Sequence, residues 1–145
     1  MGLYGFKARF VPYVLAGTKT HTIRSVRAHP DKPGNVMHLY TGLRTKKAKL
    51  LMRVECVKVE SIAITCEVKD LKGGGAARLV YRVEIDGIAL DSSELEALAR
   101  RDGFPGGWSE MFAFWQDEHD FPFSGHVIHW RKAGERRDPP LLRRP

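Results

Sequence analysis

The 145-residue chain has little cysteine and no long apolar run. Its two cysteines, Cys56 and Cys66, lie in apolar segments typical of strands, without a C-x-x-C partner or a histidine at zinc-site spacing. We therefore expect reduced core cysteines, as in a cytoplasmic protein. No stretch approaches the ~20 apolar residues that a membrane helix needs, so the sequence predicts neither export nor membrane insertion.

Acidic residues are also scarce relative to basic ones, 17 against 24, which gives a formal net charge of +7. Such an excess favours an anionic partner such as nucleic acid. More than half of it lies in the segment 131–145, which holds six basic and two acidic residues and consecutive prolines. We predict an extended or disordered tail there, which either binds phosphates weakly or only solubilises the chain. Residues 1–130 are predicted to form a single domain.

The patterning inside the domain predicts several strands and a few short helices. Pro12 and Gly17 mark the first turn and the C-cap of a first helix, and Ser92 or Ser93 and Gly103 bound a second. A third helical pattern covers 107–119. Alternating or β-branched runs predict strands at 21–26, 36–42, 48–66, 78–90 and 123–130. The sequence therefore predicts an α+β fold, a small, mainly antiparallel β-barrel with short helices packed at its side or end.

The most distinctive segment is AGTKTHTIRS at 16–25, where a helix cap is expected to become a strand. With PGNVMHLYTG, LARRDGF, MFAFW and FSGHVIHW in the same order along the chain, it resembles the ASCH family of PUA-like β-barrel proteins. The signature Gly-x-Lys-x-x-(Thr or Glu)-x-Arg of that family is met by Gly17, Lys19, Thr22 and Arg24. The resemblance covers nearly the whole chain up to Trp130.

Small bacterial members of this family with Lys-x-x-Thr in the signature are amidohydrolases that remove acyl groups from N4-acylcytidines. The resemblance implies that Lys19, Thr22 and a carboxylate are the catalytic residues. Asp102 of ARRDGF stands where the family carries a glutamate, one methylene longer, and Glu110 is the alternative carboxylate.

This set of groups has a chemical logic of its own. A threonine hydroxyl attacks an acyl carbon only as it loses its proton to a base. Lys19 can be that base if burial and the like charge of Arg24 lower its pKa. Asp102 would then orient the lysine or assist the leaving amine. An attack by water, with Thr22 only binding the substrate, remains the alternative mechanism.

Four further residues are predicted to bind the nucleoside. Arg24 is expected to hold the cytosine carbonyl or a sugar oxygen. Tyr40, Phe104 and Trp115 are either core residues or, where one lines the pocket, a surface on which a pyrimidine stacks.

The six histidines do not suggest a metal site. His126 and His129 are three residues apart in a predicted strand, so their side chains face opposite sides and cannot chelate one ion together. His21 lies inside the signature. We predict neither a metal nor a cofactor.

Two other functions remain open in the sequence. An RNA-binding module would depend on Lys46, Lys47 and Lys49 and on the arginine-rich tail. A ribonuclease for single-stranded RNA would use Tyr40, Lys46 and Ser124. The hydroxyl of Thr22 favours the amidohydrolase, because a signature with glutamate at this position has no such nucleophile. The acyl range and the oligomeric state cannot be predicted.

Overall fold

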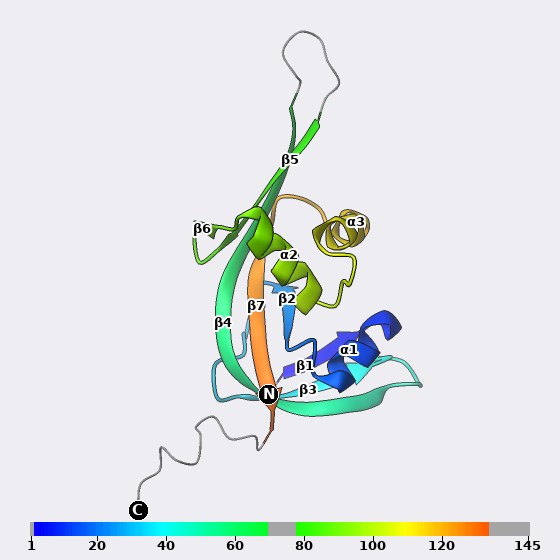
Figure 1. Cartoon of the computed structure of the whole chain (residues 1–145). Helices are drawn as coiled ribbons and strands as arrows, with labels where there is room; N and C mark the ends of the chain where they lie inside the picture. Colours follow the sequence, from blue (N-terminus) through cyan, green and yellow to red (C-terminus); the bar gives the residue numbers. More distant parts are fainter. Residues whose placement is uncertain (1, 70–77, 134–145) are drawn as a thin grey trace, which may run out of the picture.

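In the computed structural model, which describes residues 2–69 and 78–133, seven strands form one sheet with three short α-helices beside it (Figure 1). The predicted α+β class is therefore confirmed. The elements are β1 (Gly2–Phe6), the 3-10 turn η1 (Ala8–Phe10), α1 (Val11–Ala16), β2 (His21–Ser25), β3 (Val36–Thr41), β4 (Lys49–Lys69), β5 (Arg78–Ile85), β6 (Ile88–Ala89), α2 (Ser92–Arg101), α3 (Trp108–Glu118) and β7 (Phe123–Lys132).

The long strand β4 organises the sheet. It pairs antiparallel with β3 through 49–55, with β7 through 54–64 and with β5 through 62–69. β2 joins the sheet antiparallel to β7, and β1 joins parallel to β3. Figure 1 shows β4 curving from β3 at one end to the β5 ribbon at the other. A single strand thus links all parts of the sheet.

The sheet that the structure describes does not close into the predicted small β-barrel. In the described part of the chain β1 and β2 are end strands that do not pair with each other. The long strand β4 pairs with β3 at one end and with β5 at the other. The sheet therefore extends along β4 and stays open. A side chain bridges the gap: Arg24 Nη2 donates a hydrogen bond to the carbonyl oxygen of Gly5 at 2.8 Å.

Helix α1 follows its sequence signals closely. Pro12 lies in the first turn, where a missing N–H costs nothing, and Gly17 is the C-cap with φ of 81°. The backbone N–H groups of Thr18 and Lys19 both donate to the carbonyl oxygen of Tyr13. This cap reverses the chain and sends it directly into β2.

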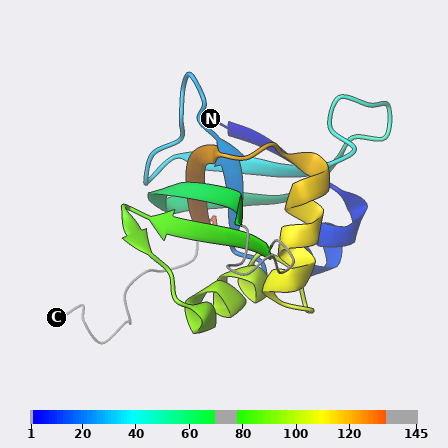
Figure 2. The ribbon, with the colours of Figure 1, turned by 90° about the horizontal axis from the view of Figure 1, so that it is seen from above.

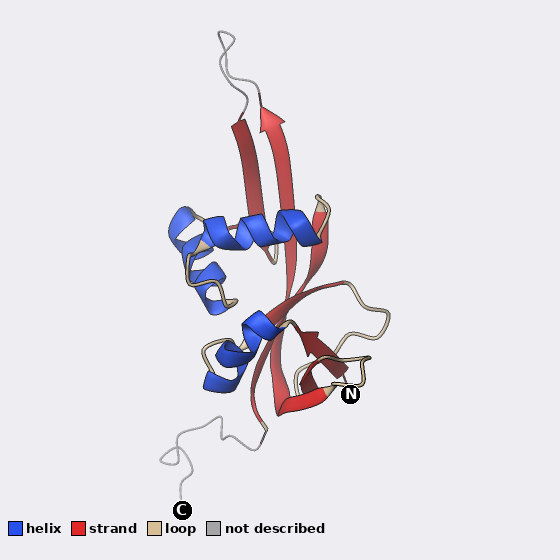
Figure 3. Cartoon of the chain, turned by 90° about the vertical axis from the view of Figure 1, so that its right-hand side faces the viewer, coloured by secondary structure: helices blue, strands red, loops and turns tan. Residues whose placement is uncertain are grey.

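Helix α2 begins one residue earlier than expected. Asp91, rather than Ser92 or Ser93, is the N-cap, and it forms a capping box with Glu94. The helix buries Leu95, Leu98 and Ala99 and ends at Arg101, with Asp102 as its C-cap. Figures 2 and 3 show α2 and α3 together beside the curved sheet, and in Figure 1 the C-terminal end of α2 approaches β2 and α1.

Strand β7 continues to Lys132, two residues beyond the predicted end of the domain. The rest of the predicted tail, 134–145, and most of the glycine-rich turn, 70–77, lie outside the described residues. Cys56 is buried, Cys66 is half-buried, and neither forms a disulfide. Within the described ranges no helix combines the length and apolar character needed to cross a membrane.

Candidate active site

A cavity of about 150 Å³ lies where β1, the α1–β2 connection, α3 and the end of α2 meet. Four of its lining residues carry polar side chains that the sequence singled out: Lys19, Thr22, Arg24 and Asp102. Its apolar walls are aromatic, formed by Phe6, Phe10, Phe114 and Trp115. The structure thus gathers the three predicted catalytic residues around one small pocket.

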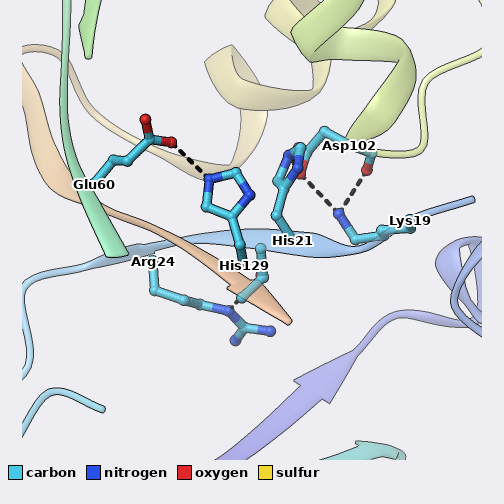
Figure 4. Close-up of polar contacts among 7 residues, drawn as sticks. Lys19, His21, Arg24, Glu60, Asp102 and His129 are labelled. Carbon is cyan, nitrogen blue, oxygen red and sulfur yellow. Dashed lines mark hydrogen bonds and ion pairs between the residues drawn. The ribbon is translucent and has the colours of Figure 1, made fainter. Parts of the chain in front are cut away.

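Lys19 and Asp102 form a buried ion pair. Lys19 Nζ donates to Asp102 Oδ1 at 2.8 Å and to the Asp102 backbone oxygen at 2.6 Å (Figure 4). The two residues are only 3% and 5% exposed. Because a charged lysine or aspartate is almost never buried without a partner, each side chain holds the other in place.

A glycine next to Asp102 allows this contact. Gly103 has φ of 102°, a conformation that other residues rarely adopt. A Cβ at this position would lie 2.9 Å from Phe10 Cδ1 and 3.6 Å from Lys19 Cδ. The end of α2 therefore packs so closely on Phe10, beside Lys19, that a side chain at this position would clash with the Phe10 ring.

His21 belongs to the site, although no role was predicted for it. Its ring is 1% exposed, and Nε2 lies 3.0 Å from Asp102 Oδ1, on the oxygen that Lys19 also contacts. The ring packs against His129, whose Nε2 lies 2.6 Å from Glu60 Oε1. The sequence contained one indication of this position. Side chains alternate between the two faces of a strand, so His21 of β2 is expected on the face opposite Thr22.

The charges of the pair depend on burial and on each other. Burial lowers the pKa of Lys19, although the charge of Asp102 opposes this shift. For Asp102, burial acts to raise the pKa, but Lys19 and His21 together hold it below its usual range. Asp102 is therefore a carboxylate at neutral pH, and Lys19 loses its proton more readily than an exposed lysine does.

Thr22 is 4% exposed and lies on the same face of β2 as Arg24. Arg24 Nε donates a hydrogen bond to Thr22 Oγ1 at 2.9 Å. The hydroxyl proton is thus left free to go to a base, because the oxygen is used here as an acceptor. Among the described residues no hydrogen bond joins Thr22 to Lys19, whose ammonium is directed at Asp102.

Of the three aromatic residues predicted to bind a pyrimidine, only Trp115 lines the cavity. Phe104 is fully buried and packs edge-on against Phe10, so it supports the wall from behind. Tyr40 follows the buried Leu39 in β3, and alternation turns its side chain to the opposite face. The sequence reasoning missed Phe6, Phe10 and Phe114, which look like ordinary core residues.

Glu110, the alternative carboxylate, does not reach the lysine. Its Oε2 accepts a hydrogen bond from Arg9 Nη2 at 2.8 Å, and its Oε1 accepts one from the Gly106 N–H at 2.7 Å. The geometry therefore favours Asp102 as the partner of Lys19.

Replacing each carboxylate by its amide tests whether Asp102 or Glu110 is the functional carboxylate. If the predicted amidohydrolase activity holds, Asp102→Asn should lower its kcat/KM at least about 100-fold, because Lys19 loses the charge that holds it in place. Glu110→Gln removes an exposed charge and changes the side-chain shape as little as Asp102→Asn does. It should change kcat/KM less than about twofold. Steady-state hydrolysis of an N4-acylcytidine by both purified variants measures the difference. The opposite ranking would move the carboxylate role to Glu110.

No three histidine, cysteine, aspartate or glutamate side chains are arranged to hold a metal ion in residues 2–69 and 78–133. In comparisons with known proteins, no family model, no curated protein and no solved structure matches this chain.

Proposed function

We propose that the chain is a metal-free amidohydrolase that cleaves the N4-acyl amide of acylated cytidine, as its resemblance to the PUA-like ASCH family implies. The observation that carries the proposal is the buried Lys19–Asp102 pair beside Thr22 in one aromatic pocket. Paired titratable groups with shifted pKa values in a cavity are typical of catalytic sites. A cavity of about 150 Å³ is large enough for a six-membered ring.

In the first half of the reaction, neutral Lys19 takes the proton of Thr22 as Oγ1 forms a bond to the acyl carbon. The Lys19 ammonium then gives this proton to N4 as the carbon–nitrogen bond breaks, so cytidine leaves and an acyl ester remains on Thr22. For this step Lys19 Nζ turns from the backbone oxygen of Asp102 toward the hydroxyl. Arg24 holds Oγ1 during the attack.

In the second half, water attacks the ester carbon and gives a proton to Lys19. Lys19 returns it to Thr22 Oγ1 as the ester bond breaks, and the carboxylic acid leaves. Both tetrahedral intermediates carry an oxyanion that needs hydrogen-bond donors. In the described chain β2 pairs on one side only, with β7, so alternate backbone N–H groups on its other side are available.

The role of Lys19 sets the pH dependence of the reaction. A protonated lysine cannot act as the base, so kcat/KM should rise with pH and level off above the pKa of Lys19. Because burial lowers that pKa, the plateau should begin below the 10.5 of a free lysine. Initial rates from pH 5 to pH 10, with circular dichroism as a check of folding, measure this profile. A rate independent of pH over this range would contradict the base role.

An RNA-binding module is the second candidate, and one observation favours it. Lys46, Lys47 and Lys49 are exposed in and after the β3–β4 connection, and none forms an ion pair with a described residue. Substitution of all three by glutamine should weaken any binding of single-stranded RNA and reduce its salt dependence, but leave amide hydrolysis intact.

The geometry does not favour the ribonuclease. Tyr40 pairs with Leu50 of β4, whereas Ser124 pairs with Ala63, near the other end of that strand. At about 3.3 Å per residue, the two side chains lie too far apart to act on one phosphate.

A substrate comparison tests the proposed reaction. The purified chain should release cytidine from N4-acetylcytidine, as followed by the change in ultraviolet absorbance, and should leave N6-acetyladenosine largely intact. We expect the larger purine to fit this pocket less well than cytosine does. Equal rates on both compounds would mean that the cavity does not select the base, and no release from either would contradict the proposed activity.

A further inference from the structure

One charged group that lines the cavity forms no ion pair in the described part of the chain. Lys19 is paired with Asp102, and Lys7, at the edge of the cavity, is paired with Glu118 at 3.1 Å. Arg24 also lines the cavity but forms no ion pair with any described residue. A partly buried guanidinium is unfavourable without an anion beside it, which makes Arg24 a candidate binding group.

A second arginine increases the positive potential around Arg24. The guanidinium carbon of Arg27 lies 4.0 Å from the centre of the Tyr4 ring, and that of Arg24 lies 5.3 Å from it. Burial, with the like charge of Arg27, lowers the pKa of Arg24 to about 10. The charge of Asp102 also acts on Arg24, but without an ion pair, and Asp31, which accepts hydrogen bonds from Tyr4 and Asn35, pairs with neither arginine.

Arg24 still has donors to offer. Its Nε is bonded to Thr22 Oγ1 and its Nη2 to the carbonyl oxygen of Gly5, so Nη1 has no described partner. The planar fork of an arginine suits the two oxygens of a carboxylate. Because Nε lies 2.9 Å from the attacking oxygen, an anion on Arg24 would lie next to the amide under attack.

We propose that the preferred substrates carry a carboxylate at the far end of the acyl group, as in amides of succinic acid, and that Arg24 binds this carboxylate in place of the cytosine carbonyl or sugar oxygen expected from the sequence. The proposal rests on the proposed function for the position of the amide. A carboxylate two carbons from the reacting carbonyl reaches the Arg24 guanidinium, which is hydrogen-bonded to Thr22. The 5′-phosphate of a nucleotide does not, since it lies at the opposite end of the nucleoside from N4.

The test compares two substrates that differ only in charge, N4-succinylcytidine and the same compound with its free carboxylate converted to a carboxamide. For the parent chain, kcat/KM should be about tenfold or more higher for the acid, mainly through KM. The KM of the acid should rise with salt while that of the carboxamide stays constant. Equal values for the two compounds would overturn the proposal.

Variants identify the group responsible. Arg24→Gln should bring the ratio of the two kcat/KM values close to one, and Arg27→Gln should lower it partially. Arg53→Gln, at an exposed arginine of β4 outside the cavity, should leave the ratio unchanged. A fall in kcat for both substrates alike in Arg24→Gln would instead assign Arg24 to the oxyanion. If a variant does not fold, the salt dependence of KM in the parent chain still tests whether a positive charge binds the acid.

Binding separates this proposal from the proposed function. Calorimetric titration of Thr22→Val with each compound measures affinity without turnover. Tighter binding of the acid by a chain whose parent hydrolyses neither compound would leave the anion site standing and contradict the amidohydrolase. Hydrolysis of both compounds with equal affinity and equal kcat/KM would support the amidohydrolase and contradict the anion site.

Discussion

Thr22→Val is expected to lower the hydrolysis of N4-acetylcytidine at least about 10³-fold while the chain remains folded. Valine keeps the shape of the side chain and its preference for a strand, and it removes only the hydroxyl. The hydrogen bond from the charged Arg24 is lost as well, at a cost in stability of about 1.5–3 kcal/mol. Turnover number and thermal unfolding, measured on the same preparation, separate the chemical effect from the structural one.

Thr20→Val provides a matched control, because Thr20 is exposed just before β2 and takes no part in the cavity. Its turnover should stay within about twofold of the parent. A Thr22→Val variant that retained most of its activity would exclude Thr22 as the nucleophile and favour direct attack by water.

Lys19→Met should lose both activity and stability. Without the ammonium, the carboxylate of Asp102 remains buried with only His21 beside it, and loss of one partner of a buried pair typically costs about 3–5 kcal/mol. The reaction loses its base, so turnover should fall at least about 100-fold. Denaturant unfolding and steady-state kinetics measure the two effects.

The double variant Lys19→Met with Asp102→Asn distinguishes the causes. It removes the buried charge, so it should be more stable than Lys19→Met alone while remaining inactive. A double variant less stable than the single one would mean that the ion pair is not what Lys19 contributes to the fold.

The parts of the site that depend on local sequence could be predicted. Gly17 ends α1 and Gly103 follows α2, and both signals placed Lys19 and Asp102 at the ends of helices. The resemblance to the ASCH family then predicted that Lys19, Asp102 and Thr22 belong to one site. The distance between Lys19 and Asp102 could not be predicted, because it depends on where the C-terminal end of α2 meets the α1–β2 connection.

Long-range packing also explains the errors. The barrel was expected from the pattern of antiparallel strands and from the resemblance to a PUA-like family, but the 21-residue β4 pairs with different strands at its two ends. Phe104 and Phe114 both look like core residues in sequence, yet only Phe114 lines the cavity. His21 acquires a partner only when the end of α2 is placed over β2.

The most direct test of the proposed function is the turnover of N4-acetylcytidine by the parent chain with a metal chelator present. Release of cytidine and acetate in equal amounts, absent in Thr22→Val, is the predicted result. Failure of the folded parent chain to release cytidine would contradict the assignment of Thr22, Lys19 and Asp102 to amide hydrolysis.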